Sequence, residues 1–274
     1  INDWTLLSDK QTLTKTYTSN TTETVTIKDL AGNTATVTVK IANIDKTAPT
    51  AQVSYSITEL TNQDVVVTIK ASEQLQILSG WTLSTDKLSL TKTYTSNTTE
   101  NVTIKDLAGN TTTVTVKITN IEKSELVAVV TYSITESTNQ NVVVKIKANK
   151  QLQAINGWTL LSDKQTMTKT YTSNVTENIT IKDLAGNTAT VNVKITNIDK
   201  TAPTAQLSYS TTELTNQDVV VTIKANEQLQ AINGWSLSTD KLSLTKTYTS
   251  NTTETVTIKD LAGNSTTVNI KINN

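Results

Sequence analysis

Residues 102–118 read VTIKDLAGNTTTVTVKI, and this stretch decides how the chain is expected to fold. Val and Ile alternate with Thr and Lys on both sides of the segment DLAGN, and a period of two is typical of half-buried strands. The Asp106 side chain can hydrogen-bond the backbone that follows it, and Gly109 can adopt the positive φ of a tight turn. The stretch therefore predicts an antiparallel β-hairpin. A cation-binding loop is the alternative interpretation, because Asp106 and Asn110 carry oxygen ligands.

The residues before this hairpin predict four more strands by the same alternation. Strands are expected at residues 53–57, 65–71, 81–83 and 88–94, and no segment has a helical period. Six short strands and one Trp predict two antiparallel sheets packed face to face, with Trp81 in the core. The alternative for Trp81 is an exposed platform on which a sugar ring stacks.

The pattern recurs along the chain as a 77-residue repeat. Trp4, Trp81, Trp158 and Trp235 follow this constant spacing, and so do the glycines of the four DLAGN segments. Residues 4–50 differ from residues 158–204 at 6 of 47 positions but from residues 81–127 at 12, so alternate repeats match more closely than adjacent ones. A repeat of this length is sufficient for a small domain of its own.

Pro-containing segments mark the expected domain boundaries, because Pro interrupts a strand pattern. The segment NIDKTAPT occurs at residues 43–50 and again at 197–204, whereas the intervening linker reads NIEKSELV. We expect a partial domain with C-terminal strands only, followed by three full domains. Their ranges are 1–46, 47–123, 124–200 and 201–274.

Composition excludes several kinds of chemistry. The 274 residues include no His, no Cys and no Phe, and the 24 basic side chains are all Lys, balanced by 24 acidic ones. Without His or Cys the chain has no Ser-His-Asp or Cys-His nucleophile and no disulfide. A net charge of +0 argues against nucleic-acid binding, and no apolar run is long enough for a membrane helix. We expect no enzymatic activity, no catalytic residues and no resident cofactor.

Thr is the most frequent residue type and occupies the outward positions of the expected strands. The fold class expected is therefore all-β, a tandem array of small Ig-like antiparallel β-sandwich domains. The second and third repeats differ in charge, with Glu73 replaced by Lys150. One hypothesis is that such positions pair neighbouring chains, and the alternative is variation on a solvated face.

The hairpin VTIKDLAGNT, the strand VTVKI and the linker NIDKTAPT resemble the C-terminal part of bacterial Ig-like domains of the BIg type. Such domains occur in tandem in large cell-surface and adhesin proteins, and the resemblance covers all the repeats. The resemblance implies an extracellular stalk that projects another domain from the cell surface. The linker NIEKSELV lacks Pro and departs from the family pattern.

The resemblance also implies calcium at domain junctions, since some arrays of this family hold it there. The matching positions are Asp45 and Asp199 in the linkers and Asp29 and Asp183 in the hairpins, with Asp106 and Glu122 at related places. Calcium prefers 6–8 oxygen ligands. The alternative is a polar linker that holds no metal.

The function expected is a structural stalk or spacer at a bacterial cell surface, with flanking repeats of the same chain as its partners. A first alternative is a subunit of an extracellular fibre, in which another copy completes the partial domain 1–46. In that case an inner face that includes Val25, Ile27, Val37 and Val39 would lie open. A second alternative is a glycan- or protein-binding adhesion module.

Overall fold

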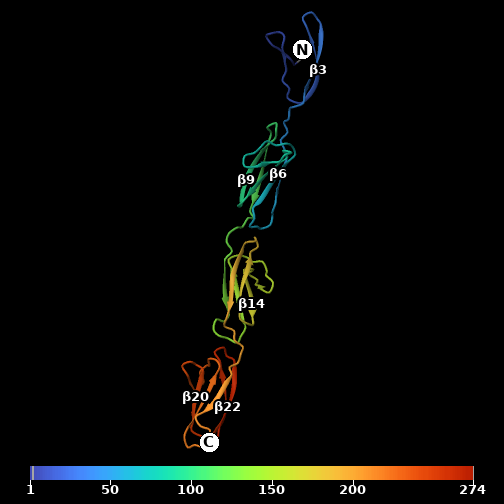
Figure 1. The fold of residues 1–274 in the computed structure, drawn as a ribbon. Coiled ribbons are helices and arrows are strands. Elements are labelled where there is room, and N and C mark those ends of the chain that lie inside the picture. The colour runs from blue at the N-terminus through green and yellow to red at the C-terminus, as the bar shows by residue number, and fades with distance from the viewer. Residues whose placement is uncertain (2, 274) are drawn as a thin grey trace. The chain divides into compact units, whose positions relative to one another are not determined.

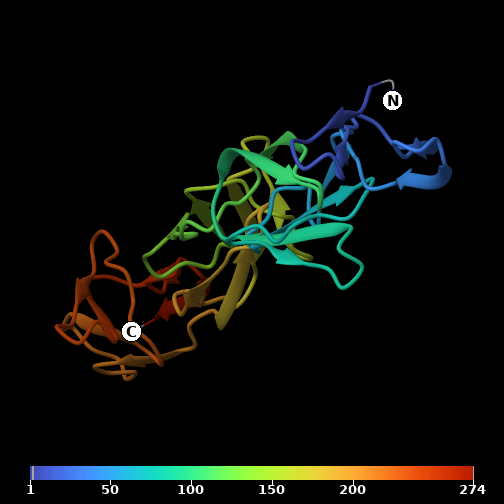
Figure 2. The ribbon, with the colours of Figure 1, turned by 90° about the horizontal axis from the view of Figure 1, so that it is seen from above.

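The computed structural model describes residues 1 and 3–273, which form strands and connecting loops (Figures 1 and 2). None of these residues lies in a helix, so the described chain has no helix that could cross a membrane. The chain divides into two compact units, residues 1–123 and residues 124–274. The first unit holds the partial first repeat and the second repeat, and the second unit holds the third and fourth repeats.

The second repeat is built from one sheet of four strands and one hairpin. The sheet has the order β5-β6-β8-β7 with every pair antiparallel. Its strands are β5 (Ala51–Tyr55), β6 (Val65–Ala71), β7 (Thr82–Leu83) and β8 (Ser89–Tyr94). The hairpin joins β9 (Thr98–Lys105) to β10 (Thr111–Ile118), with Val102 opposite Val114. The hairpin predicted from residues 102–118 is thus confirmed.

The inward side chains of the sheet and the hairpin form one core. Val65, Val67 and Ile69 of β6 are each 0% exposed, and alternate residues of β9 and β10 pack in the same cluster. The outward residues of the hairpin are Thr, Asn and Lys. Burial of one side of each strand follows from the period-two pattern, since successive side chains point to opposite faces. The expected fold class, a tandem array of small antiparallel β-sandwich domains, is confirmed.

The same six strands recur in the third and fourth repeats. The third repeat contains β11 (Ala128–Tyr132), β12 (Val142–Ala148), β13 (Thr159–Leu160), β14 (Thr166–Tyr171), β15 (Val175–Lys182) and β16 (Thr188–Ile195). The fourth contains β17 (Ala205–Tyr209), β18 (Val219–Ala225), β19 (Ser236–Leu237), β20 (Ser243–Tyr248), β21 (Thr252–Lys259) and β22 (Ser265–Ile272).

Two expected strand ends are displaced. The prediction that the first strand continues to Ile57 is wrong, because β5 ends at Tyr55. Ser56 Oγ accepts from Val66 N at 2.9 Å, so a side chain replaces the backbone in the ladder. Trp81 precedes β7 and closes a turn in which its N–H donates to Leu78 O at 3.1 Å.

The described part of the first repeat contains only β1 (Thr5–Leu6), β2 (Leu13–Thr14), β3 (Thr21–Lys28) and β4 (Thr34–Ile41). Its expected open inner face is open only in part. Ile27 is 38% exposed and Val37 is 49% exposed, but Val25 is buried at 8%.

Candidate functional site at the linkers

The linker that leads into the second repeat is fastened to the sandwich that follows it. Thr50 N donates to Ser72 Oγ at 3.0 Å, and Ser72 N donates to Thr50 O at 2.9 Å. Thr112 Oγ1 donates to the carbonyl of Pro49, and Asn110 Nδ2 donates to the carbonyl of Asp45 at 3.2 Å. Both ends of this linker segment are therefore tied to the sandwich.

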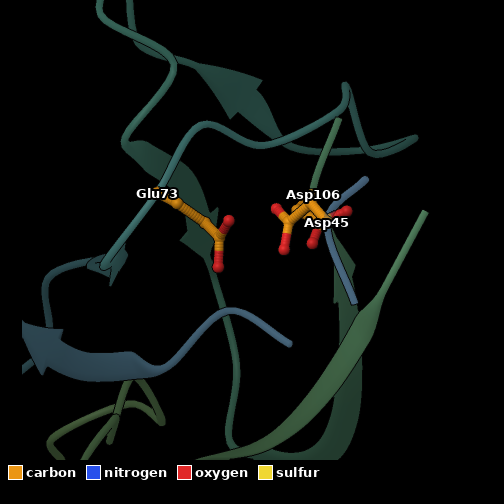
Figure 3. Close-up of side chains that lie close together, drawn as sticks. All are labelled: Asp45, Glu73 and Asp106. Carbon is orange, nitrogen blue, oxygen red and sulfur yellow. The ribbon is translucent and has the colours of Figure 1, made fainter. Parts of the chain in front are cut away.

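This attachment brings three carboxylates together. One oxygen from each of Asp45, Glu73 and Asp106 lies within 4.8 Å of the other two. Figure 3 shows the Glu73 carboxylate pointing toward the two aspartates. The linker contributes Asp45, the segment after β6 contributes Glu73, and the turn after β9 contributes Asp106. The fourth repeat forms the same triplet from Asp199, Glu227 and Asp260.

The turn DLAGN holds the buried member of the triplet. Asp106 is 1% exposed, and its Oδ1 accepts from Gly109 N at 2.6 Å and from Asn110 N at 2.8 Å. Its Oδ2 accepts from Asn110 Nδ2 at 2.8 Å. Burial alone raises the pKa of Asp106, but the bonds from Asn110 and Gly109 outweigh it and lower the pKa. The interpretation of DLAGN as a hairpin turn is correct, and the same Asp also belongs to the triplet.

The pKa of Glu73 is shifted in the opposite direction, upward. Burial raises its pKa, and the negative charges of Asp45 and Asp106 raise it further. The pKa of Glu227 is raised for the same reasons, by burial and then by Asp199 and Asp260. A cation placed among the three carboxylates would offset this repulsion. Three carboxylates supply part of the oxygen ligand set that calcium prefers.

The third repeat has a different arrangement at the same place. Lys150 takes the position of Glu73, and its Nζ lies 3.5 Å from Asp183 Oδ2. Lys150 Nζ also donates to the carbonyl of Ser124, which lies in the linker. Asp183 is 2% exposed, and burial raises its pKa. Bonds from Asn187 and Gly186, together with the charge of Lys150, reverse this and lower the pKa.

The four aspartates proposed from the sequence as calcium ligands have three different surroundings in the structure. Asp45 and Asp199 lie in carboxylate triplets, whereas Asp183 lies beside Lys150. Asp29 accepts from Asn33 N and Asn33 Nδ2, each at 2.8 Å, and belongs to neither of the triplets found among the described residues.

Sequence reasoning missed Glu73, Glu227 and Asp260 as members of these triplets. The hypothesis that placed Glu73 and Lys150 on a face that pairs neighbouring chains is not supported, because both are half-buried and point into their own repeats. A signal was available in the spacing, since Glu73 and Glu227 are separated by the same interval as Asp45 and Asp199.

The Trp residues lie against the cores. Trp81 is 9% exposed, its ring packs edge-to-face on Tyr94 at 6.3 Å, and Lys92 Nζ lies 5.6 Å from its centroid. Trp158 and Trp235 are half-buried against their own cores. The interpretation of Trp81 as a core residue is thus supported over that of an open platform.

Comparisons with known proteins identify no family. No protein-family model matches the chain, and no curated protein matches it. One similar solved structure is described as a crystal structure with a xylogluco-oligosaccharide. The two are 12% identical with a TM-score of 0.24, and the match covers 82% of this chain and 59% of that one. The chain therefore spans less than two thirds of that structure, and the similarity is too weak to carry an argument about fold or function.

Proposed function

We propose that this chain is a structural stalk or spacer of tandem β-sandwich repeats in a bacterial cell-surface or adhesin protein. The observation that carries the proposal is the attachment of the linkers at both ends. In the first unit, Asn20 binds the main chain of Ile44, with Nδ2 donating at 2.9 Å and Oδ1 accepting at 2.8 Å. The next residues are held by Asn110 and Thr112 of the following sandwich. Little of the linker is free to act as a hinge.

The second unit repeats this arrangement. Asn174 binds both main-chain groups of Ile198, and Asn264 Nδ2 donates to Asp199 O at 3.0 Å. A further bond joins the third sandwich to the fourth, since Asn139 N donates to Ala262 O at 3.0 Å. Repeats joined in this way can add length with a defined orientation, which is what a spacer requires.

Small-angle X-ray scattering of the chain tests the stalk. We expect a maximum dimension that increases by a constant amount each time a pair of adjacent repeats is added. A compact particle, or one whose dimension does not grow with added repeats, would refute the proposal. An extracellular location is part of the proposal, and export to the cell surface in the native host is its test.

We further propose that calcium binds the two carboxylate triplets and strengthens the linker attachment. The observation that favours this is the convergence of Asp45, Glu73 and Asp106, with the same triplet at Asp199, Glu227 and Asp260. Isothermal titration calorimetry is expected to show two sites per chain, with both lost in a variant carrying Glu73→Gln and Glu227→Gln. Heats of dilution alone would contradict the proposal.

The alternative of a fibre subunit rests on one observation, the partial exposure of Ile27 and Val37 in the first repeat. Strands from another chain can pair with an open sheet edge, and strands added there would cover this apolar face. Electron microscopy of the purified chain tests this alternative. Filaments that disappear when residues 1–46 are deleted would favour the fibre over the stalk.

A further inference from the structure

The three full repeats alternate at one position, which holds Glu73, then Lys150, then Glu227. In the second and fourth repeats this position completes a group of three carboxylates. In the third repeat the Lys150 ammonium lies 3.5 Å from Asp183 Oδ2, and the side chains of Lys150 and Asp183 are 17% and 3% exposed. A positive charge in the third repeat thus occupies the place where the other two repeats have a third negative charge.

Lys150 links the turn to the incoming linker of its own repeat. Its Nζ contacts Asp183 in the turn after β15 and donates to the carbonyl of Ser124 in the linker. The next linker residues are held by Asn149, whose Oδ1 accepts from Val127 N at 3.0 Å and whose Nδ2 donates to Glu125 O at 3.2 Å. Lys150 therefore holds the linker at Ser124, and Asn149 holds it at Glu125 and Val127.

Other contacts of this linker also differ from those of the second repeat. Thr112, which binds the carbonyl of Pro49, is replaced by Ala189, whose side chain has no hydroxyl. Pro49 itself is replaced by Leu126, which is 3% exposed and belongs to the core of the third repeat. Residues 124–127 are consequently held to the third repeat by Lys150, by Asn149 and by the buried side chain of Leu126.

We propose that Lys150 is a built-in cation, a positioning residue that keeps residues 124–127 attached to the third repeat whether or not a divalent cation is present. The linkers of the second and fourth repeats, by contrast, need a cation to reach full attachment. The three linker attachments of the chain are then cation-dependent, cation-independent and cation-dependent in turn. The contrast between junctions rests on the calcium sites of the proposed function, whereas the role of Lys150 rests on its own contacts.

Hydrogen exchange measured by mass spectrometry on the full chain can follow each linker separately. The protected amides are Thr50 N, Val127 N and Thr204 N, which donate to Ser72 Oγ, Asn149 Oδ1 and Asn226 Oδ1. Peptides that extend to Val53 or Leu207 distinguish the two identical NIDKTAPT linkers by mass. Replacing chelator with calcium chloride is expected to slow exchange at Thr50 and Thr204 about tenfold and to leave Val127 unchanged.

Two substitutions of Lys150 test its role. Lys150→Met removes the charge and is expected to speed exchange at Val127 about tenfold, with or without calcium. Lys150→Glu creates the acidic residue found at positions 73 and 227. Beside Asp183 this carboxylate would restore an acidic pair in place of the ion pair, and exchange at Val127 is expected to become sensitive to calcium. Lys145→Met, at an exposed position of β12, is the matched control and should change nothing.

The converse substitution is Glu73→Lys, which is expected to make exchange at Thr50 insensitive to calcium while Thr204 still responds. The inference is overturned if Lys150→Met leaves Val127 exchange unchanged, or if Lys150→Glu gains no calcium response while the wild-type linkers show theirs. If the wild-type linkers do not respond to calcium, the calcium proposal fails and the contrast between junctions fails with it. A loss of protection in Lys150→Met would then still establish Lys150 as the residue that holds residues 124–127 to the third repeat.

Discussion

Asn97 binds both main-chain groups of Ile121: its Nδ2 donates to the Ile121 carbonyl at 3.0 Å, and its Oδ1 accepts from the Ile121 N–H at 2.8 Å. Asn97 precedes β9, and Ile121 follows β10, so the pair joins the two ends of the hairpin. The triplet Asn97-Thr98-Thr99 also matches the pattern of a glycosylation acceptor. In the folded chain the amide nitrogen already donates to a carbonyl, which favours a structural role.

Replacing Asn97 with Ala is expected to destabilise the second repeat by about 1–3 kcal/mol, because two half-buried main-chain groups lose their partners. Hydrogen exchange of a peptide that covers β10 can report this change, since its sequence TTTVTVKI occurs only once in the chain. Asn101→Ala on the exposed face of β9 is the control, and it should cost less than about 0.5 kcal/mol. If both substitutions lower the stability of the second repeat equally, the Asn97 bonds to Ile121 contribute no more stability than an exposed Asn does.

Lys87 occupies a left-handed backbone conformation, with φ of 59°, in the turn between β7 and β8. This conformation costs a residue with a Cβ about 1 kcal/mol or more, and Gly avoids most of that cost. Lys87→Gly is therefore expected to stabilise the second repeat by about 0.5 kcal/mol after the larger unfolded-state entropy of Gly is subtracted. Slower exchange in the β10 peptide would show this.

The control for that turn is Lys105→Gly, since Lys105 is exposed at the end of β9. Gly in a strand costs about 0.5–1 kcal/mol, so this variant should exchange faster than the wild type. If both Gly variants weaken the repeat, the strain assigned to Lys87 is absent.

Gly109 has φ of 102°, and no atom outside Gly109 and its two chain neighbours lies within 4 Å of the position that a Cβ would occupy. Gly109→Ala therefore tests backbone strain without a steric clash, and we expect a loss of about 1–3 kcal/mol. Because Gly109 N donates to Asp106 Oδ1, the loss should be accompanied by faster exchange at Thr50. Ala108→Gly in the same turn is a useful comparison, and a larger loss there than at Gly109 would contradict the assignment.

A Tyr–Glu bond is repeated in every repeat, at Tyr17–Glu23, Tyr94–Glu100, Tyr171–Glu177 and Tyr248–Glu254. Burial, and then the bond to Glu23, raises the pKa of Tyr17 from 10.0 to about 12. Between these pH values the folded state binds more protons than the unfolded state, so stability falls as pH rises. The Tyr bond and Lys15 lower the pKa of Glu23, whose contribution is present above pH 4.5 and is lost in acid.

Urea unfolding at a series of pH values can measure this dependence. We expect stability to decrease between about pH 10 and pH 12 and to decrease less steeply when the four Tyr residues are replaced by Phe. The two proteins differ only in these four phenols, so the difference between the two curves isolates their contribution. If the free energy of unfolding falls equally steeply above pH 10 in both proteins, the Tyr–Glu bonds do not control its dependence on alkaline pH.

Alternation of apolar and polar residues sufficed to predict the strands of β6, β9 and β10, because each strand buries one face. Spacing of Trp and Gly likewise predicted the repeat. The ends of the short strands did not follow from the pattern, since Ser56 replaces a ladder bond with its side chain and Trp81 closes a turn.

The sequence by itself determined that this protein is a tandem array of small antiparallel β-sandwich domains, because period-two alternation and a constant repeat spacing are local properties of the chain. Only the tertiary structure decided which acidic side chains meet. Asp45, Glu73 and Asp106 come from a linker, a loop and a turn that approach one another when the sheets pack. The role of Lys150 depends on the same packing, since its charge matters only where Asp183 and the Ser124 carbonyl face it.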